Sequence, residues 1–273
     1  SLLLDTILAS FLVSGSVSWL YFADRLMEFP LGIFSIAIGT VILPTLSAQF
    51  ASSAHGDFSA TLDWGLRVLL LVGVPAALGL FLLASPLVIT LFQYAAFSPE
   101  DAQMTAWALM AYAFGFMGFS LVKVLVPGFY ARQQTRVPVR IAITALLCGM
   151  VLSLSGVLLA VHWGWSAPHA VLAAATSTSA WINAVLLWRR LRHEGVYRPG
   201  AGWGGFALRL LLANGLMAAV VLWLHGPVES WLTEGLSGRV ERLLTIIVAA
   251  GVTYLLVLAA TGLRPHHLRR QLS

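Results

Sequence analysis

Long uncharged stretches of apolar residues alternate with short charged or turn-forming segments along the whole chain. Residues 6–23 and residues 29–56 each contain no Asp, Glu, Lys or Arg. A helix of about 20 apolar residues, rising 1.5 Å per residue, crosses the hydrocarbon core of a bilayer. The alternating hydrophobicity of a membrane β-barrel is absent, so the pattern predicts an all-α polytopic membrane protein. Eight transmembrane helices are predicted, over residues 3–22, 29–50, 64–84, 103–125, 139–161, 168–188, 205–225 and 241–262.

Prolines lie inside two of these predicted spans, at Pro44 and Pro75, and just after the ends of two others, at Pro86 and Pro127. A proline removes one backbone hydrogen bond and kinks a helix. Membrane helices tolerate such kinks where neighbours or water satisfy the freed carbonyl groups. Two interpretations stay open: ordinary kinks, and hinges for the alternating access of a transporter.

The segments that connect the spans differ regularly in charge. Basic residues gather in every second connection and in the C-terminal tail: Arg132, Arg136 and Arg140, then Arg189, Arg190, Arg192 and Arg198, then Arg264, Arg269 and Arg270. The connections 92–101 and 162–169 contain no Lys or Arg, and the connection 226–240 carries two Glu against one Arg. Basic connections face the cytoplasm, so the pattern predicts that these segments and both ends of the chain are cytoplasmic.

Composition indicates a membrane protein and not a soluble domain, and the motifs of common enzymes are missing. Of the 273 residues, 59% are hydrophobic and only 10% are charged, whereas a soluble domain carries about 25% charged residues. The net charge of +5 is spread over separate connections, so membrane topology explains it better than a nucleic-acid partner. The single Cys148 excludes an internal disulfide, and the seven His form no metal-binding pair. No Gly-rich phosphate loop or nucleophile elbow is present, so neither an ATP-driven pump nor an enzyme is supported, and we expect no cofactor or metal.

The chain runs from its first residues directly into the apolar stretch Leu2-Leu3-Leu4, without an initiator Met. The basic start and short apolar core of a signal peptide are not visible. We therefore expect the chain to be part of a longer protein.

Three charged residues, Asp24, Arg25 and Glu28, stand between the first two predicted spans. Ionisable residues at membrane depth cost about 2.5–3.5 kcal/mol on insertion scales and mark binding sites or pathways. On a helix Arg25 and Glu28 would share a face, so that Glu28 holds a guanidinium whose fork suits a phosphate. The alternative is a charged turn between two spans, with a new helix beginning near residue 29. Asp5, in the first span, is either an ion or proton site or a residue in interfacial water.

Residues after 204 read as an appended helical hairpin, set off by the Arg-rich segment 189–198 and the Gly-rich segment 200–205. The hairpin has a Leu-rich face, formed by Leu208, Leu211, Leu212 and Leu216. That face is expected to pack against helices, with a lipid chain as the alternative occupant. The basic segment 126–139 either sets the topology or meets anionic lipid headgroups.

Several motifs resemble the MurJ/MviN family of lipid II flippases, which serve bacterial cell-wall synthesis. The first is Tyr21-Phe22-Ala23-Asp24-Arg25-Leu26-Met27-Glu28-Phe29-Pro30-Leu31-Gly32, followed by Gly39-Thr40-Val41-Ile42-Leu43-Pro44. The second is Pro127-Gly128-Phe129-Tyr130-Ala131-Arg132-Gln133, ending in Thr135-Arg136-Val137-Pro138-Val139. Leu91-Phe92-Gln93-Tyr94 ahead of Phe97 also fits. The motifs are long, they occur in the family's order, and the resemblance covers nearly the whole chain.

The resemblance implies the C-terminal portion of a fourteen-helix transporter. Residues 1–190 would form a six-helix C-lobe, residues 191–204 a cytoplasmic linker, and residues 205–273 a helix pair with a basic tail. The N-terminal lobe of six helices, which completes the central cavity, would be a partner. The helix pair would form the groove proposed in the family for the lipid tail.

The resemblance also assigns site residues. Arg25 and Glu28 match the family's cavity Arg and Glu, and Asp24 is adjacent, so Arg25 would meet the diphosphate of lipid II. Some members bind sodium through an acidic residue on the seventh helix and polar residues on the eleventh and twelfth, and Asp5 matches the acidic residue. The fifth predicted span departs from that pattern, because its polar residues are only Thr144, Cys148, Ser153 and Ser155.

These expectations together describe a flippase for the lipid-linked peptidoglycan precursor lipid II in the bacterial inner membrane. Two lobes would rock around a cationic cavity while the lipid tail stays among membrane lipids. Membrane potential or a sodium gradient would drive turnover, since one charge moved through 100 mV yields about 2.3 kcal/mol. The alternatives are another exporter of the same superfamily, for polysaccharide lipids or drugs, and a membrane-embedded sugar transferase.

Overall fold

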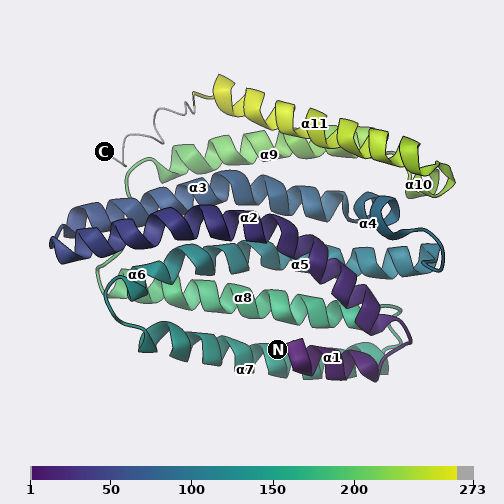
Figure 1. The fold of residues 1–273 in the computed structure, drawn as a ribbon, viewed down its shortest axis with the longest axis horizontal. Helices are drawn as coiled ribbons and strands as arrows, with labels where there is room; N and C mark the ends of the chain where they lie inside the picture. Colours follow the sequence, from purple (N-terminus) through teal and green to yellow (C-terminus); the bar gives the residue numbers. More distant parts are fainter. Residues whose placement is uncertain (1, 263–273) are drawn as a thin grey trace.

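The computed structural model describes residues 2–262, and it describes side chains for residues 5–33, 41–54 and 56–262. Within these residues the chain forms helices and no strand, as the hydropathy pattern predicted. The first six helices are α1 (Leu2–Ser10), α2 (Ser16–Ala51), α3 (His55–Leu82), α4 (Ala84–Phe92), α5 (Pro99–Leu125) and α6 (Pro127–Tyr130). The remaining ones are α7 (Arg136–His162), α8 (Pro168–His193), α9 (Trp203–His225), α10 (Val228–Thr233) and α11 (Leu236–Ala260). Figure 1 shows the long helices lying roughly side by side, with their connections at the two ends of an elongated bundle.

Six helical segments in the described part of the chain are long and apolar enough to cross a membrane. They are Gly56–Leu82, Pro99–Tyr130, Arg136–His162, Pro168–His193, Trp203–His225 and Leu236–Ala260, and they overlap the last six predicted spans. α2 is longer still, since its 36 residues rise about 54 Å. The protein is therefore a multi-pass helical membrane protein.

The first two predicted spans have the wrong boundaries. The chain turns at residues 11–15 instead of at the charged cluster. Gly15 has φ 102°, a left-handed conformation that glycine adopts readily, and a Cβ there would lie 2.6 Å from the Trp19 ring. α2 then runs uninterrupted through Pro30 and Pro44. Neither a charged turn nor a new helix near residue 29 exists, and the cluster lies within α2.

Two of the other prolines, Pro86 and Pro127, lie close to helix ends. Leu83 separates α3 from α4 shortly before Pro86, and Val126 separates α5 from α6 directly before Pro127. Pro75 lies inside continuous α3. Pro127 is the first residue of α6 and Pro86 is the third residue of α4, and a proline in the first turn of a helix loses no intrahelical hydrogen bond.

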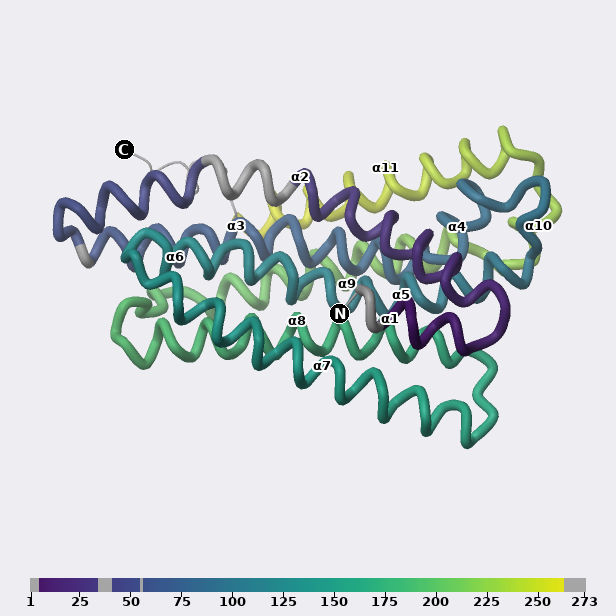
Figure 2. The backbone as a smooth tube through the Cα atoms, turned by 60° about the horizontal axis from the view of Figure 1, so that its bottom comes forward, coloured from purple at the N-terminus to yellow at the C-terminus, as the bar shows by residue number. Residues whose placement is uncertain are grey.

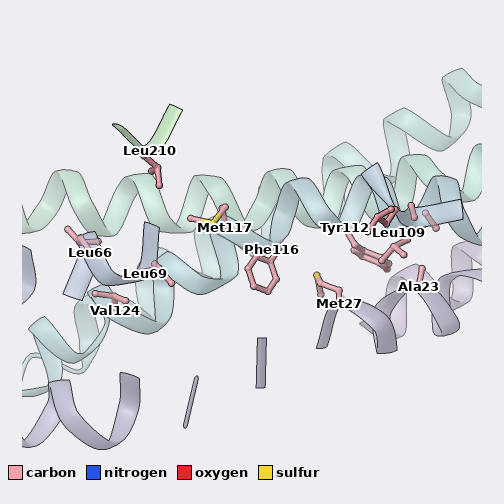
Figure 3. Close-up of a cluster of buried hydrophobic side chains, with 14 of the residues drawn as sticks. Ala23, Met27, Leu66, Leu69, Leu109, Tyr112, Phe116, Met117, Val124 and Leu210 are labelled. Carbon is pink, nitrogen blue, oxygen red and sulfur yellow. The ribbon is translucent and has the colours of Figure 1, made fainter. Parts of the chain in front are cut away.

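α5 lies at the centre of the bundle and packs against α8, α2 and α3. Small residues let α5 and α8 approach closely, as in many membrane helix pairs. A Cβ added to Gly115 would lie 2.3 Å from the Ser177 hydroxyl, and one added to Gly118 would lie 2.8 Å from the Trp181 backbone nitrogen. Figure 3 shows buried side chains that α2, α3, α5 and α9 contribute to one apolar core: Ala23, Met27, Leu66, Leu69, Leu109, Tyr112, Phe116, Met117, Val124 and Leu210.

The C-terminal helices α9 and α11 pack against each other, and α9 also packs on α3 (Figures 1 and 2). α9 buries a stripe at helical spacing, formed by Phe206, Leu210, Ala213, Met217 and Val221. The predicted Leu-rich face is not this stripe. Leu208, Leu211, Leu212 and Leu216 are 49–71% exposed. The expectation that they pack against helices is wrong for the described residues, and they lie on the outer face of the pair.

A buried carboxylate, Asp63 of α3, fixes the start of this helix pair. Its Oδ1 accepts hydrogen bonds from the Tyr197 hydroxyl and Trp203 Nε1, both at 2.8 Å, and from the Gly200 amide at 3.2 Å. Its Oδ2 accepts from Arg67 Nε at 2.8 Å, and the Arg67 guanidinium lies 5.0 Å from the Trp203 ring centroid. Burial and the bond to Asp63 raise the pKa of Tyr197 above its ordinary value. We call this group, Asp63, Arg67, Tyr197, Gly200 and Trp203, the Asp63 anchor.

A second polar contact holds the pair at the opposite end of the bundle. Arg239 of α11 is buried, and its Nη2 donates to the carbonyl oxygen of Leu232 at 3.0 Å. Its Nη1 lies 3.4 and 3.5 Å from the carbonyl oxygens of Ile89 and Gln93, where α4 ends. A cation at the C-terminal end of a helix is stabilised by the helix dipole. The helix pair is therefore bound to α3 at one end of the bundle and to α4 at the other.

Candidate functional site

α2 presents two different faces around its charged residues. One face is buried in the bundle and carries Leu20, Ala23 and Met27. The other face is exposed and carries Arg25 and Glu28 between the apolar side chains of Tyr21 and Phe29. Because an ion pair in contact with lipid is costly, such a face suits a water-filled space or another protein surface.

Arg25 and Glu28 form an ion pair along this exposed face. Arg25 Nη1 donates to Glu28 Oε2 at 2.7 Å, and the guanidinium lies 5.1 Å from the centroid of the Tyr21 ring. A guanidinium has five N–H donors in a planar fork, so the pairing with Glu28 leaves donors for an incoming anion. The spacing in sequence predicted this pair, and the continuous helix produces it.

Asp24 points to a different part of the structure from Arg25. It helps to line a cavity of about 130 Å³, together with Asp5, Tyr112 and Thr176. The cavity lies where α1, α2, α5 and α8 meet. The four site residues predicted from the sequence therefore form two groups: Arg25 with Glu28 on the open face of α2, and Asp24 with Asp5 at a cavity beside it.

Asp5 is buried and receives hydrogen bonds from two other helices. Its Oδ1 accepts from the Ser153 hydroxyl of α7 at 3.2 Å, and its Oδ2 accepts from the Thr176 hydroxyl of α8 at 3.0 Å. The interpretation of Asp5 as a residue in interfacial water is wrong. The described residues contain no group of three or more His, Cys, Asp or Glu suited to a metal ion. The oxygens around Asp5 form a hard, all-oxygen donor set, which suits an alkali cation better than a transition metal.

Sequence reasoning missed Thr176 and Tyr112 as members of this group. A signal for Thr176 existed, because residues 176–179 are four consecutive hydroxyl residues inside an apolar span. Tyr112 carried no such signal, because a single aromatic residue in a membrane helix is most often part of the core.

The basic connections lie together at one end of the bundle. The turn after α6 and the segment after α8 are both at the left end in Figure 1, as is the turn between α2 and α3. Arg132 Nη2 lies 2.7 Å from Glu194 Oε2, and Arg190 Nε lies 2.6 Å from Glu194 Oε1. Burial alone would raise the pKa of Glu194, but hydrogen bonds and positive charge from the two arginines outweigh it and lower the pKa below its ordinary value. The basic tail residues Arg264, Arg269 and Arg270 lie outside the described residues.

Comparison with protein families gives one match that covers most of the chain. The model of the family described as "Lipid II flippase MurJ" matches residues 1–240. The chain is 41% identical over 264 residues to a probable lipid II flippase MurJ of Vibrio cholerae, covering 97% of this chain and 49% of that protein. It is 42% identical over 223 residues to lipid II flippase MurJ of Burkholderia cenocepacia, covering 82% of this chain and 42% of that protein.

A solved structure shares the fold. A lipid II flippase MurJ in an inward closed conformation superposes with a TM-score of 0.74 at 23% sequence identity. The match covers 93% of this chain and 49% of that structure. The chain thus spans about half the length of the relatives it matches.

Proposed function

Because this chain belongs to the MurJ family of lipid II flippases, we propose that it works as the C-terminal part of such a flippase. Its substrate would be lipid II, the lipid-linked peptidoglycan precursor, moved across the bacterial inner membrane. The observation that carries the proposal is the Arg25–Glu28 pair, exposed between Tyr21 and Phe29 on the open face of α2. No covalent bond is made or broken in this activity, so the site needs a binding group and not a nucleophile.

In this proposal Arg25 binds the diphosphate of the substrate. The guanidinium stays charged at every physiological pH and matches phosphate oxygens with two parallel hydrogen bonds. Glu28 and the Tyr21 ring hold the guanidinium from two sides, which reduces the conformational freedom that Arg25 loses when the anion binds. When the anion leaves, Arg25 would pair with Glu28 again, so binding stays reversible.

The partner across this face would be an N-terminal lobe of six helices, which the open face of α2 would meet across the central cavity. The two lobes would rock around the diphosphate in alternating access, with both ends of this chain in the cytoplasm. Residues 1–190 would be the C-terminal lobe, and the helix pair within 205–273 would accompany the lipid tail. Its four outer leucines on α9 offer an apolar surface for that tail.

The proposal is tested with Arg25→Ala in the intact protein, expressed in bacteria depleted of their own flippase. We expect loss of growth and accumulation of unflipped lipid II, with normal amounts of protein in the membrane. Arg140→Ala, which removes one exposed arginine from α7, is the matched control and should restore growth. Growth supported by Arg25→Ala at wild-type rate would refute the role of Arg25.

We also propose that the group around Asp5 holds a monovalent cation that contributes to the driving force. Asp5, Ser153 and Thr176 would supply the oxygens, and the cation would neutralise the buried carboxylate. Asp5→Asn should remove any sodium dependence of lipid II transport in proteoliposomes while leaving transport driven by membrane potential. Identical sodium dependence in wild type and Asp5→Asn would exclude this site.

A further inference from the structure

A second polar cavity lies at the end of the bundle where the basic connections gather. Its volume is about 360 Å³, and we call it the loop-end cavity. The residues that matter for its chemistry are Gln49 and Phe50 of α2, Phe58 of α3, Arg132 and Gln134 of the turn after α6, and Glu194 after α8. Gln49 is 24 residues after Arg25 on the same helix, about 36 Å along its axis, so this cavity is separate from the Arg25 site.

Three of the lining residues have a buried polar atom without a hydrogen-bond partner. These atoms are Gln49 Oε1, Gln134 Oε1 and Arg132 Nη1. Buried polar groups in folded proteins nearly always have a partner, so three such atoms around one cavity point to a polar occupant, either water or a ligand. Two of the atoms accept hydrogen bonds and one donates, which means that the occupant must supply both donors and an acceptor.

The local backbone explains how two of these residues reach the cavity. Gln133 has φ 58°, in the left-handed region, and the amide of Gln134 bonds back to the carbonyl oxygen of Phe129 at 3.0 Å. This reversal closes the turn after α6 and places Arg132 and Gln134 on the same cavity, on either side of Gln133. Non-glycine residues in this conformation are uncommon and concentrate at functional sites.

The charge around the cavity is positive. Arg132 is 12% exposed and uses Nη2 for Glu194, and Arg190 also pairs with Glu194. One carboxylate against two guanidinium groups leaves one positive charge, so the unpartnered Nη1 favours an anionic acceptor. The rings of Phe50 and Phe58 add an apolar wall.

We propose that the loop-end cavity binds a phosphate group that also carries hydrogen-bond donors, such as a phosphoglycerol or phosphoethanolamine group. The phosphate would accept from Arg132 Nη1, and the hydroxyl or ammonium donors would satisfy Gln49 and Gln134. The volume lies within the range of small-molecule sites, about 300–1,000 Å³. This ligand ties the end of α2 to the connections after α6 and α8, so it stabilises the lobe independently of flipping.

The first test uses the intact protein in nanodiscs of phosphatidylcholine, which has the phosphate but no hydrogen-bond donor. Native mass spectrometry and thermal unfolding are followed during addition of short-chain phosphatidylglycerol, and separately of soluble glycerol phosphate. We expect retention of at least one phosphoglycerol group and a rise in unfolding temperature, because a ligand of the folded state stabilises it. Binding in the lipid arm alone identifies a bilayer headgroup as the source, and binding in both arms identifies the phosphoglycerol group itself. Retention in neither arm means that water fills the cavity and overturns the proposal.

Three variants locate the binding. Arg132→Gln should weaken phosphoglycerol binding by roughly tenfold, as expected for loss of a charge-assisted hydrogen bond. Gln134→Leu and Gln49→Leu should reduce the preference for phosphatidylglycerol over phosphatidylcholine while Arg132 still binds phosphate.

The matched control is Arg189→Gln, which removes an exposed arginine at the same end of the bundle and outside the cavity. Unchanged affinity in this control supports the cavity as the site. An equal loss of affinity in Arg189→Gln and Arg132→Gln would show attraction to a basic surface and overturn the proposal. Because binding is measured directly, the result does not depend on whether Arg25 acts in transport.

Discussion

Two arginine–carboxylate ion pairs, one on α2 and one on α3, have nearly equal nitrogen–oxygen distances but differ in how far they are exposed. On α2, Arg25 lies 2.7 Å from Glu28, with side chains 58% and 48% exposed. On α3, Arg67 lies 2.8 Å from Asp63, with side chains 25% and 8% exposed. Asp63 accepts three further hydrogen bonds, from Tyr197, Gly200 and Trp203, whereas Glu28 is held by Arg25 on an open face.

The difference in burial distinguishes an ion pair that stabilises the fold from one whose proposed role is to bind a ligand. A buried ion pair is tolerated only when further hydrogen bonds satisfy its remaining atoms, and the Asp63 anchor meets that condition. Exposed pairs contribute little to stability. We therefore expect the exposed Arg25–Glu28 pair to contribute little to stability, which suits the ligand-binding role proposed for it. An arginine–carboxylate pair thus fixes a helix pair at one place, and at the other it forms the anion site that we propose.

The largest effect should come from removing the buried carboxylate. Asp63→Ala removes the carboxylate that pairs with the Arg67 charge and that accepts from the Tyr197 hydroxyl and the Trp203 N–H. Breaking a buried pair in this way costs about 3–5 kcal/mol of unfolding free energy. Unfolding in detergent by heat or denaturant measures this loss of unfolding free energy. Proteolysis of the segment between α8 and α9 should also become faster, because the segment is held less tightly.

Asp57→Ala is the matched control for that experiment. Asp57 is exposed in the first turn of the same helix, where a carboxylate contributes roughly 0.3–1 kcal/mol through the helix dipole. If Asp63→Ala and Asp57→Ala destabilised the protein equally, the Asp63 anchor would not hold the helix pair, and the contrast with α2 would disappear.

Arg25→Lys should separate charge from geometry at the exposed pair. Lysine keeps the positive charge and loses the planar fork, so a bidentate phosphate contact is lost. We expect lipid II transport to fall by at least roughly tenfold, with an unfolding temperature equal to that of wild type. Arg140→Lys is the control, and it should change neither quantity. Full transport by Arg25→Lys would mean that a point charge is sufficient.

The sequence predicted local features well because they depend on a few neighbouring residues. Six of the eight predicted spans overlap helical segments that are both long and apolar enough to cross a membrane, since length and hydropathy are read directly from the chain. The Arg25–Glu28 contact followed from a spacing of three residues on a helix. The turn at Gly15 was missed because Ser14, Gly15 and Ser16 are only weakly polar and lie within a longer uncharged stretch.

Long-range partners could not be predicted in the same way. Asp63 bonds to Tyr197 and Trp203, which lie 134 and 140 residues further along the chain. Asp5 and Thr176 are 171 residues apart. A hydropathy pattern places each of these residues on a helix, but only the packing of α1, α3, α8 and α9 decides which of them meet. For the same reason the sequence did not show that Asp63 joins α3 to the start of α9, or that Asp5 accepts from α7 and α8.

The smallest effect should appear at Glu194, whose surroundings lie between those of the two pairs. Arg132 and Arg190 hold the pKa of this partly buried carboxyl below its ordinary value of 4.5. A carboxyl with a lowered folded-state pKa adds stability above its unfolded pKa, and that stability is lost as pH falls through the folded pKa. The unfolding temperature of wild type should thus exceed that of Glu194→Gln at pH 7, and the difference should shrink below about pH 4.5. Glu28→Gln, at the exposed pair, should differ little from wild type across the same range. A constant difference for Glu194→Gln at every pH would show that packing, and not charge, holds the connections after α6 and α8 together.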